Sequence, residues 1–199
     1  FDRDAVQTFE KASASIEFDK QNYLDMGENS LVIIKRLEKD PLLREKRSFM
    51  VMVDGELRGR IGSTGQESVL VEVTTPTAVA NIRSRNSADG TGDFKISVNP
   101  DKSSTITVYD GVAEVIAGGK TIRVESNQGV NVDKEGSAVA PQELPNPPVL
   151  AEPLYASIFY YRDLPPKINF EWAHPGEVKD FRFVLAQDPD FRQQILEEQ

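Results

Sequence analysis

Residues 104–132 read STITVYDGVAEVIAGGKTIRVESNQGVNV, and this stretch decides the fold class of the chain. Apolar residues such as Ile106 and Val108 alternate with polar ones, which is the pattern of a β-strand with one buried face. Three turn-forming segments interrupt the alternation: Asp110-Gly111, Gly118-Gly119 and Asn127-Gln128-Gly129. Glycine in such pairs supplies the positive φ of tight hairpin turns. The stretch therefore predicts four short strands in a meander, whose apolar face needs a second layer to cover it.

The same alternation continues upstream and predicts about eight strands over residues 49–132, at hairpin-like spacing. The alternating positions are Phe49, Val51 and Val53, then Leu57, then Val69, Val71 and Val73, then Val79 and Ile82, and then Phe94, Ile96 and Val98. A turn at Asp54-Gly55 is expected to end the first of these strands. So many short strands separated by turn signals indicate an all-β fold.

The segment before Phe49 mixes strand and loop signals. Residues 12–18 alternate like a half-buried strand, and residues 31–34 form a short apolar run that predicts a core strand. Residues 35–46 are rich in charge and predict a linker or a short helix, with Pro41 at a first helical position. The basic residues of this region are candidates for contact with an anionic partner, with a solvated loop as the simpler interpretation: Arg44, Lys46 and Arg47.

The composition limits the function classes. Hydrophobic residues make up 39% of the chain, which is enough for a core. No apolar run reaches the length of about 18 residues that could span a membrane. The formal net charge of −9 argues against a nucleic-acid partner, because phosphates require a basic surface. The chain has no cysteine, which excludes disulfides and thiolate chemistry, and it begins at Phe1, which indicates a processed or trimmed fragment.

No catalytic, cofactor-binding or metal-binding constellation is recognisable, so we expect a protein that is not an enzyme. The single histidine, His174, precedes Pro175-Gly176 in an expected turn, and one histidine does not make a metal site. Residues 89–93 (DGTGD) offer two carboxylates for Ca²⁺ but lack the further acidic ligands of an EF-hand loop. This segment therefore predicts a metal-free hairpin connection.

The C-terminal part has a different character. Residues 137–153 are rich in proline and predict an extended linker. In residues 154–199, the stretches 158–161, 167–172 and 180–185 supply about three strands, which is too few for a sandwich of about seven. We therefore expect this part to pack on the first domain, or to be completed by further sequence or another subunit. The aromatic residues expected to face that partner are Phe170, Trp172, Phe181 and Phe183.

Ordered blocks of the chain resemble FecR-type periplasmic domains. Residues 75–83 (TPTAVANIR) resemble the family's Thr-Pro-x-Ala-x-x-x-Val-Arg segment. Residues 105–115 resemble its Thr-x-Val-x-Val-x-x-Gly-x-Val-x-Val segment, and residues 129–132 resemble its closing Gly-x-x-Val. The resemblance covers roughly residues 4–135 and departs at Ser84-Arg85, where the family has Gly-Thr.

This resemblance implies a solenoid-like or sandwich-like β domain over residues 1–136, exported to the periplasm or the cell surface of a bacterium. The tail is similar to the Pro-rich entry and early strands of an immunoglobulin-like or fibronectin III-like module. It implies a linker over residues 137–153 and a partial module over residues 154–199.

The leading hypothesis is a non-enzymatic envelope module that binds other envelope proteins or further domains of the same protein. The best-known FecR-type proteins relay signals from outer-membrane transporters to sigma factors. This chain shows neither their cytoplasmic helical region nor their transmembrane segment, so a structural or scaffold role is placed slightly ahead of signal relay.

The alternative hypothesis is a peptidoglycan-binding or carbohydrate-binding accessory domain, which needs exposed aromatic rings for stacking on sugars. The candidates for that role are Tyr155, Phe159, Tyr160 and Tyr161. The simpler interpretation of residues 158–161 is a strand that packs within its own sandwich.

Overall fold

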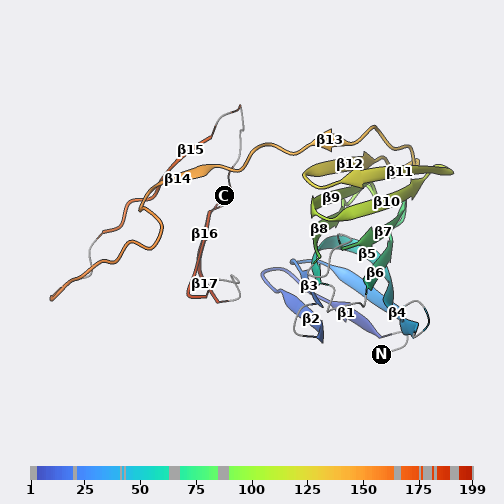
Figure 1. The fold of residues 1–199 in the computed structure, drawn as a ribbon, viewed down its shortest axis with the longest axis horizontal. Helices are drawn as coiled ribbons and strands as arrows, with labels where there is room; N and C mark the ends of the chain where they lie inside the picture. The colour runs from blue at the N-terminus through green and yellow to red at the C-terminus, as the bar shows by residue number, and fades with distance from the viewer. Residues whose placement is uncertain are drawn as a thin grey trace. The chain divides into compact units, whose positions relative to one another are not determined.

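The computed structural model describes residues 4–19, 22–40, 42, 44–62, 68–84, 90–163, 167–174, 176, 181, 183–188 and 193–198. Every regular element within these residues is a β-strand, which confirms the all-β prediction (Figure 1). None of the described residues forms a helix with the length and apolar character needed to cross a membrane. The chain divides into two compact units, Phe1–Leu144 and Pro145–Gln199, which are described separately.

The first unit is a sheet of 13 strands in its described part. These strands are β1 (Ala5–Gln7), β2 (Ala14–Asp19), β3 (Asn22–Met26), β4 (Leu31–Asp40), β5 (Glu45–Gly62), β6 (Ser68–Thr74), β7 (Val79–Arg83), β8 (Thr91–Val98), β9 (Ser104–Asp110), β10 (Val112–Ala117), β11 (Lys120–Glu125), β12 (Gln128–Val132) and β13 (Gln142–Glu143). Neighbouring strands are antiparallel except β5 and β6, which are parallel. The sheet curls until β11 lies beside β12 (Figure 1).

Strand β5 joins the two halves of this sheet. Its residues 45–54 pair with β4, and its first residues also pair with β6. Its residues 55–62 pair with β8, and residues 57–60 also pair with β3. Because pairing continues on both sides of Gly55, the expected turn at Asp54-Gly55 is wrong. This position is instead a bend within one long strand.

The bend at Gly55 depends on a close contact with Ser30. Gly55 has a φ of 90°, and a Cβ atom at this position would lie 2.2 Å from Ser30 Oγ and 2.5 Å from Ser30 Cα. The next amide, Glu56 N–H, donates a 2.9 Å hydrogen bond to Ser30 Oγ. Ser30 is itself held by Thr8, whose Oγ1 accepts the Ser30 N–H at 2.9 Å. Only glycine fits the φ and the space available here.

The bend also shifts the alternation of β5 by one residue. From Ser48 to Gly55 the buried side chains are at even positions, such as Met50 and Met52. After Gly55 they are at odd positions, such as Leu57 and Ile61. Since side chains alternate along a strand, this shift turns the later even positions toward solvent.

The strands within residues 104–132 are confirmed, but the predicted meander is wrong. Strand β9 pairs with β8 and β12, whereas β10 pairs with β7 and β11. Gly111 alone separates β9 from β10, and one residue is too short for a hairpin loop. The chain therefore passes at Gly111, with a φ of 98°, from one half of the curled sheet to the other.

The two halves enclose one hydrophobic core. Its central side chains are at most 1% exposed and come from both halves: Val71, Ile82, Ala113 and Val115 from one, and Phe94, Ile96, Ile106 and Val108 from the other. The burial of Val108 and Val115 confirms the alternation predicted from the sequence. Each half therefore supplies the layer that covers the other, without a helix.

The described residues of the charged segment 35–46 do not form the expected linker or helix. Strand β4 extends through Asp40 and pairs antiparallel with β5, which begins at Glu45. Glu38 lies directly opposite Arg47 in this strand pair. Cross-strand pairing overrides the helical tendency of Lys and Glu. Pro41, the expected first helical residue, lies outside the described residues.

The second unit contains two two-stranded sheets in its described part. Strand β14 (Val149–Glu152) pairs with β15 (Glu171–Ala173), and β16 (Phe183–Ala186) pairs with β17 (Gln194–Glu198). Residues 158–161 form no strand and are exposed, so the expected strand there is wrong. Part of the Pro-rich segment belongs to the first unit, because β13 pairs with β12.

We predict that Gly55→Ala lowers the free energy of unfolding by roughly 2–4 kcal/mol, through its unfavourable φ and its overlap with Ser30. Gly119→Ala is the matched control, because Gly119 has a φ of 75° but no atom within 4 Å of a Cβ. Its free energy of unfolding should fall by only roughly 1–2 kcal/mol, which is the cost of the unfavourable φ. Denaturant unfolding that gave equal losses for both variants would contradict the close contact with Ser30.

We also predict that Val108→Asp lowers the free energy of unfolding by at least about 3 kcal/mol, because it places an unpaired charge in the core. Ile116→Asp makes a comparable change at a position that is 41% exposed, and it should cost about 1 kcal/mol or less. An unchanged melting temperature for Val108→Asp would contradict the assignment of Val108 to the core.

Candidate functional site

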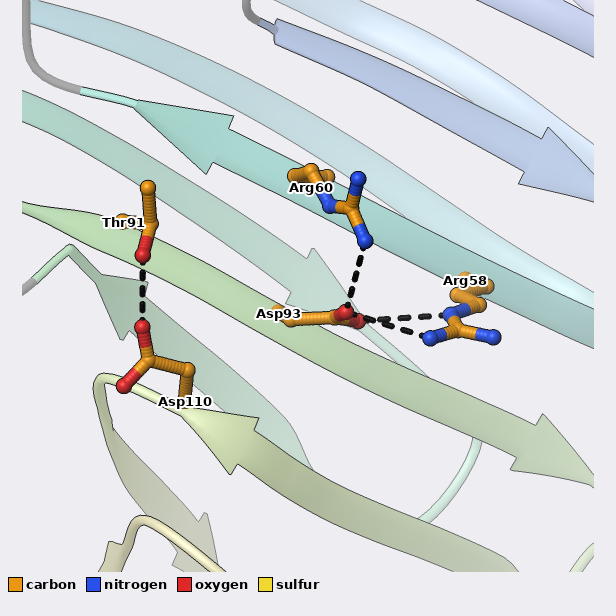
Figure 2. A network of polar contacts seen from close by, with 5 residues as sticks. All are labelled: Arg58, Arg60, Thr91, Asp93 and Asp110. Atoms are coloured by element: carbon orange, nitrogen blue, oxygen red, sulfur yellow. Dashed lines mark hydrogen bonds and ion pairs between the residues drawn. The ribbon is translucent and has the colours of Figure 1, made fainter. Parts of the chain in front are cut away.

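The most structured polar cluster lies on the solvent face of β5, β8 and β9 (Figure 2). Arg58 and Arg60 come from β5 after the bend, where even positions face solvent. Asp93 lies opposite Arg60 on the neighbouring strand β8. Gly59, between the two arginines, and Phe94, next to Asp93, are buried on the core side, so the sheet holds the polar side chains on its other face.

One carboxylate binds both arginine side chains. Arg58 Nε donates to Asp93 Oδ1 at 3.3 Å, and Arg58 Nη2 donates to Asp93 Oδ2 at 3.1 Å. Arg60 Nη2 donates to the same Oδ2 at 3.4 Å. The Asp93 side chain is 15% exposed, whereas those of Arg58 and Arg60 are 56% and 47% exposed. The acid therefore lies beneath two guanidinium groups that face solvent.

Aromatic rings flank the two arginines. The Arg58 guanidinium lies over the Tyr109 ring, 5.3 Å from its centroid, and the Arg60 guanidinium lies 5.9 Å from the centroid of Tyr23. These are cation–π distances. The hydrogen bond to Asp93 raises the pKa of Arg58 above its ordinary value, although partial burial acts in the opposite direction. We call Tyr23, Arg58, Arg60, Asp93 and Tyr109 the arginine–tyrosine face.

A separate contact closes the end of this cluster. Thr91 Oγ1 donates a 2.6 Å hydrogen bond to Asp110 Oδ2 (Figure 2). The segment considered for Ca²⁺, residues 89–93, begins at Asp89, which lies outside the described residues. Its other acid, Asp93, accepts hydrogen bonds from two arginines. Among the described residues, no group of three or more His, Cys, Asp or Glu side chains is arranged to hold a metal ion.

A second buried acid, Glu45, also binds two arginines. Arg47 and Arg83 both donate hydrogen bonds to its carboxylate, which is 6% exposed. Burial alone would raise the pKa of Glu45, but the hydrogen bonds from Arg47 and Arg83 outweigh it and leave the pKa below its ordinary value. This cluster ties the start of β5 to β7.

The basic residues singled out from the sequence lie at this end of the sheet. Arg47 is bound to Glu45, and Arg44 is exposed, with a φ of 50°, in the turn before β5. Lys46 and Arg47 are successive strand residues, so their side chains leave on opposite faces.

The aromatic residues singled out in the second unit pack on one another. Phe183 lies 5.0 Å from Phe170 and stacks on Trp172 with the ring centroids 6.0 Å apart. Phe181 lies 6.3 Å from Trp172, which stays 42% exposed. That these rings also face a partner surface remains a prediction.

His174 makes a local structural contact. Its Nδ1 lies 2.9 Å from both the backbone nitrogen and the carbonyl oxygen of Gly176, and its Nε2 lies 2.7 Å from the Asn146 carbonyl oxygen. The imidazole thus links the end of β15 to the segment before β14.

The arginine–tyrosine face was not predicted from the sequence. The available signal was Arg58-Gly59-Arg60, two cations that alternate with glycine inside a strand. The face depends on the bend in β5 and on the register between β5 and β8, neither of which was deduced from the sequence.

Two crystal structures of a proposed anti-sigma factor from Parabacteroides distasonis ATCC 8503 have a fold similar to this chain. Their TM-scores are 0.50 and 0.51 at 11% sequence identity, over 71% of this chain. The matched region spans 60% of the length of those proteins. No protein-family profile matches the sequence. No curated protein matches it either. At this identity the likeness shows the fold alone.

We predict that Glu45→Gln lowers the free energy of unfolding at pH 7 by about 1.5–3 kcal/mol, because it removes the charged acceptor of two arginines. The folded pKa of Glu45 lies below its ordinary value of 4.5, so its contribution is complete above that value and is lost as pH falls through the folded pKa. Denaturant unfolding at several pH values should show the difference from wild type shrinking below pH 4.5.

The control for this experiment is Glu114→Gln, since Glu114 is exposed on the same half of the sheet. It should change the free energy of unfolding by less than about 0.5 kcal/mol, both at pH 7 and below pH 4.5. A difference between Glu45→Gln and wild type that is equal at neutral and acidic pH would show that the charge of Glu45 is not what stabilises the fold.

Proposed function

We propose that this chain is a non-enzymatic, signalling-related protein-binding module of the bacterial envelope. The observation that carries the proposal is the fold shared with the proposed anti-sigma factor, over 71% of this chain. The ordered FecR-type blocks in the first unit support it independently. An exposed face with Arg and Tyr side chains also supports it, because these residues are enriched where proteins bind one another most tightly.

The FecR-type blocks coincide with structural features of the fold. In the Thr-Pro-x-Ala block, Thr75 Oγ1 accepts the Ala78 N–H at 3.0 Å and so shapes the turn between β6 and β7. Ser104 at the start of β9 donates to the same Thr75 Oγ1 at 2.9 Å. Because these residues hold strands together, the FecR-type blocks support a fold like that of FecR-type domains. The partner would be determined by the exposed residues of the sheet.

Signal relay is favoured over a purely structural role by the anti-sigma description of the similar structures. The sequence alone placed the scaffold role slightly ahead. Under this proposal the first unit is the part that contacts another envelope protein, and the second unit is a partial immunoglobulin-like module beyond it. Export to the periplasm or cell surface belongs to the same proposal.

Exposed aromatic side chains keep carbohydrate or peptidoglycan binding as the second candidate. Tyr155 is fully exposed, Tyr160 is 88% exposed, Tyr161 is 62% exposed and Phe159 is 44% exposed. Aromatic rings that present a free face can stack on a ligand while their hydroxyl groups remain hydrated. Phe159, Tyr160 and Tyr161 lie in the segment where the expected strand does not form.

Photo-crosslinking in the source bacterium tests the proposal. Crosslinking residues placed across the outer faces of the first unit, in the full-length protein, should give adducts with another envelope protein. Protease treatment of intact and permeabilised cells should place the chain outside the cytoplasm. A cytoplasmic location, or no protein adduct from any position, would contradict the proposal.

Sedimentation with purified sacculi tests the second candidate in parallel. The wild-type chain is expected to stay in solution. Co-sedimentation that is abolished by Tyr155→Ala with Tyr160→Ala, but not by Tyr109→Ala, would establish carbohydrate binding through the second unit instead.

A further inference from the structure

We infer that the arginine–tyrosine face binds a carboxylate, presented by an Asp or Glu side chain of a partner protein. This inference rests on the proposed function and names the surface and the chemistry that the partner must carry.

In its direct ion pairs the face has two guanidinium groups and one carboxylate. Arg58 and Arg60 both pair with Asp93. Other ion pairs on the same half of the sheet are one to one: Lys95 with Glu56 at 2.7 Å, and Lys102 with Asp54. Arg58 Nη1, Arg60 Nε and Arg60 Nη1 donate no hydrogen bond to the residues that the structure describes. These donors are available to a further acceptor.

The donors are also held in place before a partner arrives. Asp93 binds Arg58 through two parallel hydrogen bonds, and Tyr109 supports the guanidinium on its ring. A long side chain that is already ordered loses less conformational entropy on binding. Tyr109 is 43% exposed, so it offers apolar surface beside the donors.

The neighbouring acids favour a single carboxylate over a polyanion. Asp25 lies opposite Arg58 in the register of β3 and β5, and Asp110 lies at the end of β9. The whole chain carries a formal charge of −9. These acidic residues would repel a nucleic acid or another extended polyanion. A single carboxylate can bind the guanidinium groups in the planar, paired geometry that they prefer.

The comparable cluster at Glu45 is a weaker candidate. Its carboxylate also binds two guanidinium groups, but Arg47 makes further contacts within the chain and is 33% exposed. The arginine–tyrosine face is more exposed and is flanked by two aromatic rings.

NMR titration of the purified chain tests the inference. The probe is N-acetyl-glutamate amide, added at constant ionic strength, with sodium chloride as the reference titration. The Nε–H resonances of Arg58 and Arg60 should shift and saturate with a dissociation constant on the order of 10–100 mM. Arg36 and Arg123 are internal controls, because each pairs with one local acid, Glu38 at 3.0 Å and Glu125 at 3.1 Å.

Arg58→Lys separates geometry from charge. Lysine keeps the charge but cannot form the paired hydrogen bonds, so binding at Arg60 should weaken about threefold or more. Arg123→Lys should leave the titration unchanged. Shifts that do not saturate, that are equal in all four arginines, or that persist unchanged in Arg58→Lys would overturn the inference.

This test is independent of the test of the proposed function. Protein adducts from other faces, together with a negative titration, would leave the proposed function standing and remove this surface from it.

Discussion

The contact between Gly55 and Ser30 is the constraint on which the rest of the first unit depends. It bends one strand without ending it, so β5 can pair with β4 and β6 before the bend and with β3 and β8 after it. The two halves of the curled sheet are thereby joined through a shared strand and face each other across one core. The curled sheet obtains its covering layer from its own strands in this way.

The same bend gives the surface its chemistry. Met50 and Met52 are buried at even positions, and a regular strand would direct Arg58 and Arg60 to that same core face. The shift at Gly55 reverses this and places both arginines in solvent, where Asp93 binds them. The fold and the candidate binding surface therefore have a common origin. Glu45 performs a related task at the other end of β5, where it fixes Arg47 and Arg83.

Sequence patterns predicted which residues are buried better than they predicted which strands pair. The alternation around Val108 and Val115 identified core residues, because period-2 burial depends only on neighbours along the chain. The pairing of β9 with β12 instead of β10 depends on a one-residue connection at Gly111 that looked like half of a hairpin turn. The arginine–tyrosine face was missed for a similar reason, since it combines three strands whose register is set by tertiary packing. In the second unit, residues 158–161 have strong β propensity, yet no strand within the described part of that unit pairs with them.

Amide hydrogen exchange at Glu56 measures the central element of this account directly. Glu56 N–H donates to Ser30 Oγ at the bend, inside a strand that is paired on both sides. If β5 is one continuous strand, this amide should be protected to nearly the same free energy as those of Met52 and Leu57, and Ser30→Ala should reduce that protection selectively. Exchange at Glu56 as fast as in an exposed turn, with Met52 and Leu57 still protected, would show that two separate strands meet at a flexible loop.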